Sequence, residues 1–95
     1  MANLSKELSE GMRASALLEN EEYKHALATI REGIHVQWEK SPIRDEEGQK
    51  QLKLMLKLLN DLEANIRIVA QTGKLAKIQI EQEQEKVDKL KFWRR

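Results

Sequence analysis

The sequence predicts an all-α protein, an antiparallel helical hairpin with a long, coiled-coil-like C-terminal helix. Apolar residues recur at steps of three and four along most of the chain. One proline and four glycines among 95 residues leave few turns, and an aromatic content of 4% suits a seam between helices better than a round core. The 1-95 chain is expected to form one helical domain, with a short N-terminal helix over 1-18, the hairpin over 20-72 and an extended tail helix over 73-95.

Residues 1-18 carry a sparse apolar stripe that predicts a short helix. Gly11 weakens this helix by about 1 kcal/mol relative to alanine. One interpretation is a docked helix, and the other is a weakly docked segment that frays. The stripe does not continue in phase into the next one, so we expect a break near residues 19-20, with Asn20 as the N-cap of the second helix.

The second helix is predicted from Glu21 to Lys40, because apolar residues continue at helical steps from Tyr23 to Trp38. Ser41-Pro42 ends it, since the residue before a proline avoids helical geometry. Asp45 is a suitable N-cap for the helix that follows. Trp38 either caps the hairpin core together with Ile43 and Leu52, or is an exposed anchor for a partner.

The third helix carries the strongest signal of the sequence, a run of apolar residues with alternating steps of three and four. They are Leu52, Met55, Leu59, Leu62, Ile66 and Val69, and Leu56 and Leu58 widen the apolar face. Such spacing defines the a and d positions of a helix that packs lengthwise on a partner. Because about five residues join the two helices, they should fold back as an antiparallel hairpin in which Ile34 faces Leu52 and Leu27 faces Leu59.

The same heptad continues through Gly73 and favours one helix from about residue 46 to residue 92, with a hinge at Gly73 as the alternative. Gly73 and Ala76 form a patch of small residues that permits the close approach of another helix. Residues beyond about 83 outrun the hairpin partner, so we expect homo-oligomerisation through the distal helix. The residues expected at that contact are Ala76, Ile80, Val87 and Leu90.

The C-terminal tip interleaves basic and aromatic side chains at the end of this helix. Its residues are Lys91, Phe92, Trp93, Arg94 and Arg95. Aromatic residues and arginine are enriched in interface hot spots, which makes the tip a candidate partner-binding element. The same residue types also suit contact with nucleic acid or insertion at a membrane surface. The remaining interpretation is a solubilising helix end whose cations complement the helix dipole.

No constellation in the sequence predicts catalysis, a metal or a cofactor. His25 and His35 lie ten residues apart and point to different sides of one helix. Cysteine is absent, and no serine has a His/Asp arrangement around it in the sequence. The expected function is therefore non-enzymatic, with no cofactor.

The segment from Tyr23 to Ala76 resembles small helical proteins encoded among the head-assembly and DNA-packaging genes of tailed bacteriophages. The resemblance rests on Tyr23, on the run Trp38-x-x-Ser41-Pro42-x-x-Asp45, on the leucine-rich helix and on the run 72-76, Thr-Gly-Lys-Leu-Ala. It implies a phage virion-assembly or structural protein, with a larger phage assembly protein as partner. Similarity to small terminase subunits is the alternative and implies nucleic-acid binding. A cellular coiled-coil adaptor is a third interpretation.

The formal net charge of +1 does not by itself indicate a nucleic-acid binder. No apolar run approaches the length of a membrane span, and the first residues lack the pattern of a signal peptide. We therefore expect no membrane partner, and a location in the host cytoplasm or in the virion.

Overall fold

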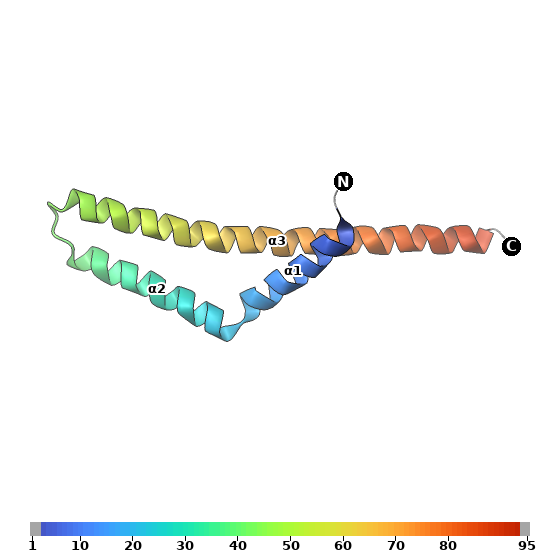
Figure 1. Cartoon of the computed structure of the whole chain (residues 1–95), viewed down its shortest axis with the longest axis horizontal. Coiled ribbons are helices and arrows are strands. Elements are labelled where there is room, and N and C mark those ends of the chain that lie inside the picture. The colour runs from blue at the N-terminus through green and yellow to red at the C-terminus, as the bar shows by residue number, and fades with distance from the viewer. Residues whose placement is uncertain (1–2, 94–95) are drawn as a thin grey trace.

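The computed structural model consists of three helices, α1 (Leu4–Glu19), α2 (Glu21–Lys40) and α3 (Glu46–Trp93). It describes the backbone of residues 3-93 and the side chains of residues 3-90. Figure 1 shows α2 and α3 as the arms of a hairpin, with α1 turning back from the start of α2 to cross α3. The predicted all-α hairpin with a long C-terminal helix is confirmed, and α3 runs through Gly73 without a break.

The ends of the helices follow from local side-chain chemistry. Asn20 lies between α1 and α2 in an extended conformation, and its side-chain oxygen accepts a 2.8 Å hydrogen bond from the Tyr23 amide. Its own amide donates to the Leu17 carbonyl. Asp45 accepts in the same way from the Gly48 amide at 3.0 Å. Both predicted N-caps are therefore confirmed, because each satisfies an amide that the first helical turn leaves unpaired.

The α2–α3 pair is held by large aliphatic side chains. Leu27, Ile34 and Leu59 form its buried cluster. Three partly buried residues pack against that cluster, namely Tyr23, Leu52 and Leu56. Leucine and isoleucine at the contact keep the two helix axes apart, since interaxial distance follows the size of the interdigitating side chains. The expected facing of α2 residues toward Leu52 and Leu59 is confirmed.

The α1–α3 crossing is built from small residues instead. Gly11 of α1 and Gly73 of α3 meet backbone to backbone, and a Cβ added to Gly73 would lie 2.5 Å from the Gly11 Cα. Neither glycine has a positive φ, so what each contributes is the absence of a side chain. The buried alanines of this crossing are Ala14, Ala70 and Ala76. The first helix is thus closely docked, which decides between the two interpretations of residues 1-18 in favour of the docked helix.

The register of the buried seam on α3 differs from the predicted one. With Leu52 as position a, the predicted seam used positions a and d, whereas the structure turns positions a and e inward. The e positions are Leu56, Glu63 and Ala70, which replace Met55, Leu62 and Val69 at d. Half of the predicted seam was therefore correct and half was wrong.

Two contacts explain why the e side is covered. The Arg31 guanidinium of α2 lies 3.2 Å from the Glu63 carboxylate and donates a 3.0 Å hydrogen bond to the Asn60 side chain. Both partners lie on the e side of α3, so this pair holds α2 there. Farther along, the close crossing of α1 requires small residues, and position e supplies Ala70.

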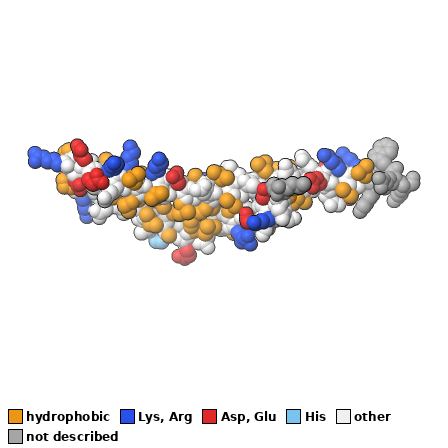
Figure 2. All heavy atoms as spheres, turned by 45° about the horizontal axis from the view of Figure 1, so that its top comes forward, with side chains coloured by type: hydrophobic (Ala, Val, Ile, Leu, Met, Phe, Trp, Pro, Cys, Tyr) orange, Lys and Arg blue, Asp and Glu red, His pale blue; other side chains and the backbone are white. Residues whose placement is uncertain are grey.

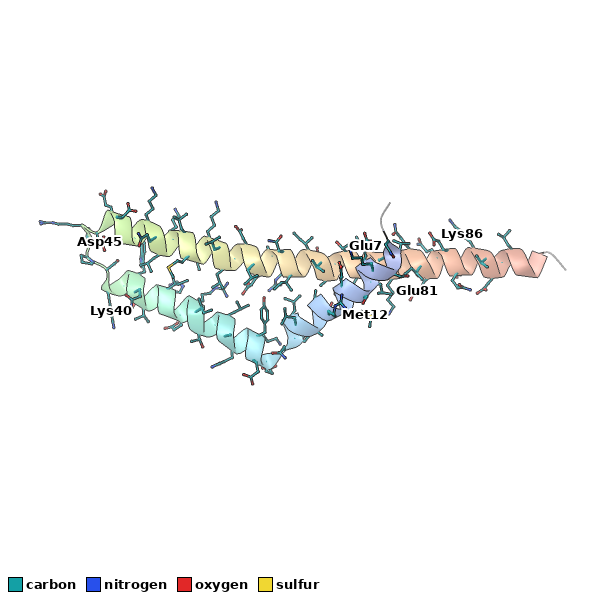
Figure 3. The ribbon with its side chains drawn as sticks, viewed as in Figure 1. Glu7, Met12, Lys40, Asp45, Glu81 and Lys86 are labelled. Atoms are coloured by element: carbon teal, nitrogen blue, oxygen red, sulfur yellow. The ribbon has the colours of Figure 1, made fainter. Side chains whose placement is uncertain are left out.

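The molecule is elongated, with extents of 79 × 26 × 15 Å. Its radius of gyration is 21.4 Å, whereas a compact domain of this length has about 12 Å. Figure 3 places Lys40 and Asp45 at the turn of the hairpin, and Glu81 and Lys86 on the part of α3 that extends past α1. None of the described helices is both long and apolar enough to cross a membrane.

Candidate association surface

The side of α3 that α1 and α2 leave uncovered is strongly apolar. We call it the open face, and it is formed by Leu54, Met55, Leu58, Leu62, Ile68 and Leu75. These six side chains are between 50% and 70% exposed. At 3.6 residues per turn all six lie within one half of the helix circumference, over about 32 Å of its length. Figure 2 shows hydrophobic side chains gathered along the middle of the molecule, with charged ones toward its ends.

The middle of α3 therefore has apolar residues on two faces. Positions a and e pack within the chain, and positions c, d and g form the open face. The remaining positions, b and f, carry a basic stripe that consists of Lys50, Lys53, Lys57, Arg67 and Lys74. An exposed apolar surface of this length is a candidate contact surface.

The solvent-accessible surface area of the chain also indicates that surface is available for contact with a partner. Six hydrophobic residues of the described part are buried, and three of them are alanines. The accessible surface is 8284 Å², whereas a compact monomer of this mass exposes about 5,700 Å². The excess is several times the ~800 Å² that each partner contributes to a standard protein interface. The chain thus has ample surface to bury in an assembly.

The four residues predicted to mediate oligomerisation do not share one environment. Ala76 is 1% exposed and is already covered within the chain. Ile80 is half-buried, whereas Val87 and Leu90 are exposed on the distal part of α3. A second copy can thus reach Val87 and Leu90 directly, but it can reach Ala76 only if α1 moves away.

The predicted partner-binding tip lies outside the described residues. The backbone of Lys91, Phe92 and Trp93 belongs to the last turn of α3, but their side chains, and all of Arg94 and Arg95, are not described. The tip therefore stays a prediction.

Trp38 is half exposed and lies beside Leu52 and Leu56 in a shallow groove between α2 and α3. Ile43 is 92% exposed, so it does not join Trp38 and Leu52 in a cap over the hairpin core. That part of the predicted cap was wrong, because the turn directs Ile43 away from the seam.

The described side chains include no group of three histidine, aspartate or glutamate residues that could hold a metal ion. Comparison of the chain with known protein families, curated proteins and solved structures gives no match.

The open face was missed at the level of sequence, although a signal for it was present. Once the a and d positions are assigned, Leu54, Ile68 and Leu75 still recur at steps of seven or fourteen residues on another side. Leu58 lies between them and the predicted d positions. A second apolar set with its own heptad spacing indicates a second contact surface.

Proposed function

We propose that this chain is a non-enzymatic assembly protein that acts through helix–helix association. The observation that supports the proposal is the open face of α3, where six large apolar side chains are half exposed or more. Leaving them in water forgoes transfer free energy of the order of 1 kcal/mol for each half-buried side chain. A helical partner that covers them recovers that free energy.

The proposal extends to a role in a phage particle. Its support is the resemblance of residues 23-76 to small proteins of head-assembly and packaging genes, and the elongated form suits a component that links copies of itself to a larger assembly protein. In this role the protein acts in the host cytoplasm and becomes part of the virion. The tip at 91-95 is then the site for the larger protein.

Light scattering of the purified protein at micromolar concentration tests the association. We expect a mass of at least two chains for the wild type and of one chain for Leu58→Glu. Leu58 is 70% exposed in the single chain, so the charge is tolerated in the monomer but not in a dry interface.

Leu90→Glu is the matched control, because Leu90 is a similarly exposed leucine on the distal part of α3. We expect it to keep the wild-type mass. If Leu90→Glu dissociates the protein and Leu58→Glu does not, association uses the distal residues predicted from the sequence. A wild type that is monomeric at every concentration contradicts the proposal.

Nucleic-acid binding is a second candidate, favoured by the basic stripe. Between Gly48 and Ile80 the helix has six basic residues and two acidic ones. One of the two acids, Glu63, pairs with Arg31 of α2. The stripe follows one side of a straight helix over about 36 Å, which suits contact with a phosphate backbone.

Binding of duplex DNA at increasing salt tests this candidate. Lys53→Gln combined with Lys57→Gln should weaken binding and reduce the slope of log K against log salt by about 2, if each lysine neutralises one phosphate. Lys86→Gln combined with Lys89→Gln, on the distal part of α3, should change the affinity and its salt dependence less. Equal losses of DNA affinity in the two double variants, or no binding of DNA by the wild type at low salt, would exclude the basic stripe as a DNA site.

A further inference from the structure

We infer that the occupant of the open face is a second copy of this chain, packed antiparallel to the first about a two-fold axis at Asn65. This inference rests on the proposed function, since it names the partner and the geometry of the same surface. Four observations lead to it, namely the symmetry of the face, the residue at its centre, the position of its one acidic group and the area available.

The first observation is that the open face is self-complementary about its midpoint. In an antiparallel pair with its axis at Asn65, residues equally distant from position 65 meet, so Leu58 faces Thr72 of the other copy. On either side of this central line, Leu54 lies near the second Leu75 and Leu62 near the second Val69. An interface with two-fold symmetry requires such matching, because each patch binds an identical patch.

The second observation is the identity of the central residue. Asn65 is exposed in the single chain and lies between Leu62 and Ile68, in the middle of a face whose other polar residues are Asp61, at the edge, and Thr72. An asparagine amide both donates and accepts hydrogen bonds, so two Asn65 side chains can pair with each other across the axis. A single asparagine in an apolar seam fixes register, because any shifted pairing leaves its amide buried without a partner.

The third observation selects the antiparallel orientation. Asp61 lies at the edge of the open face, one heptad from Leu54 and from Ile68. A parallel pair in register sets position c of each copy opposite position d of the other, so each Asp61 carboxylate lies against the apolar Leu62, on the side that borders the other copy's own α1 and α2. In the antiparallel pair each Asp61 lies near Ile68 of the other copy and at the edge, where it still reaches water. Antiparallel packing also aligns the helix dipoles favourably.

The fourth observation is the large solvent-accessible surface area of the single chain. The chain exposes 8284 Å², about 2,600 Å² more than a compact monomer of its size. A standard interface takes about 800 Å² from each partner, so the second copy can bury a full interface and still leave the basic stripe and the distal part of α3 exposed.

Cysteine cross-linking tests the arrangement directly, since the natural sequence has no cysteine. Oxidation of a mixture of Leu58→Cys and Thr72→Cys proteins should yield the covalent heterodimer as the main product, whereas each variant alone should stay monomeric on a denaturing gel. In the antiparallel pair, two copies of position 58 are about 21 Å apart along the axis. That separation is too long for a disulfide, which needs Cα atoms within about 7 Å. Asn65→Cys, at the axis, should cross-link to itself.

The outcomes separate this inference from the proposed function. Light scattering under reducing conditions first establishes whether each variant associates. A protein that associates and yields Leu58→Cys homodimers is parallel, and one that associates without either product uses another surface; both results overturn the antiparallel pairing and leave self-association standing. If the cysteine variants and the wild type are all monomeric under reducing conditions, the inference and the proposed function are both overturned.

Discussion

The two contacts that α3 makes within the chain differ in the size of the residues that form them. The α2–α3 pair meets through Leu27, Ile34 and Leu59, whose side chains fill the space between the helices. The α1–α3 crossing meets through Gly11 and Gly73, whose backbones touch. Within a few turns, α3 thus packs on α2 through large side chains and on α1 through backbone contact.

This difference determines how each contact responds to change. A contact between large side chains is stabilised by buried apolar area, so it is sensitive to the loss of atoms. A backbone contact has no side chain to lose and is sensitive to the addition of atoms, because helix backbones cannot move aside locally. Removal of atoms should therefore destabilise the α2–α3 pair, and addition of atoms should destabilise the α1–α3 crossing.

Leu59→Ala should have the largest effect and tests the first half of the comparison. Leu59 is 7% exposed at the centre of the α2–α3 cluster. We expect its truncation to lower the free energy of unfolding by about 2–4 kcal/mol. Urea unfolding followed by circular dichroism, at one fixed protein concentration, measures it.

Leu90→Ala serves as the control, since Leu90 is 58% exposed on the same helix. It should cost no more than about 0.5 kcal/mol. Equal losses for the two leucines would mean that the cluster does not stabilise the hairpin.

Gly73→Ala should have the next largest effect and tests the second half. The added methyl lies 2.5 Å from the Gly11 Cα, so the helices must separate. Overpacking costs about 1–3 kcal/mol, and helix propensity returns about 1 kcal/mol of that. We expect a net loss of up to about 2 kcal/mol in urea unfolding, with faster hydrogen exchange in α1.

Gly33→Ala, in the middle of α2, is the matched substitution in open space. No atom lies within 4 Å of the added methyl, so only helix propensity acts. It should stabilise the protein by up to about 1 kcal/mol. Should Gly73→Ala stabilise as well, the close crossing of α1 does not exist in solution.

Asn20→Ala should lower the free energy of unfolding by a smaller amount. The substitution affects both contacts, because Asn20 joins α1 to α2. Its side chain accepts from the Tyr23 amide and its amide donates to the Leu17 carbonyl. Loss of the N-cap should cost about 1 kcal/mol. Asn20→Asp keeps an acceptor at that position and should remain close to the wild type. Thermal unfolding of the two variants makes the comparison, and equal melting temperatures would argue against a capping role.

The Arg31–Glu63 pair should contribute least, although it sets the side of α3 on which α2 lies. Both side chains are partly buried, at 34% and 20% exposure, and the atoms are 3.2 Å apart. A double-mutant cycle with alanine at both positions should give a coupling of about 0.5–1 kcal/mol that falls with salt. The exposed Lys24–Glu21 pair should give less than half of that. The reverse order would show that α2 is positioned by packing alone.

Much of the fold could be predicted because its signals are local. The period of apolar residues gave the three helices, Ser41-Pro42 gave the end of α2, and Asn20 and Asp45 gave the caps. Each of these depends on atoms within about one helical turn, so it acts in the same way in any tertiary context. The continuity of α3 through Gly73 could also be predicted, since the heptad keeps its phase there.

The candidate surface was less accessible to sequence reasoning. The a/d assignment treated Met55 and Leu62 as core, although the structure leaves them half exposed. Periodicity identifies apolar faces but does not say which of two adjacent faces the chain covers itself. The docking of α1 was left open for a related reason, because a glycine lowers helix propensity but also permits close packing, and only the partner decides which effect prevails.

The sequence by itself therefore determined the helices, their boundaries and the antiparallel hairpin. Only the tertiary structure decided that Gly11 meets Gly73, that Leu56 rather than Met55 turns inward, and that one apolar side of α3 remains open. The physical reason is that α3 is apolar on two sides. Its own periodicity fits either of them, and the choice depends on contacts with residues that lie 29 or more positions away, such as Arg31 with Asn60 and Glu63.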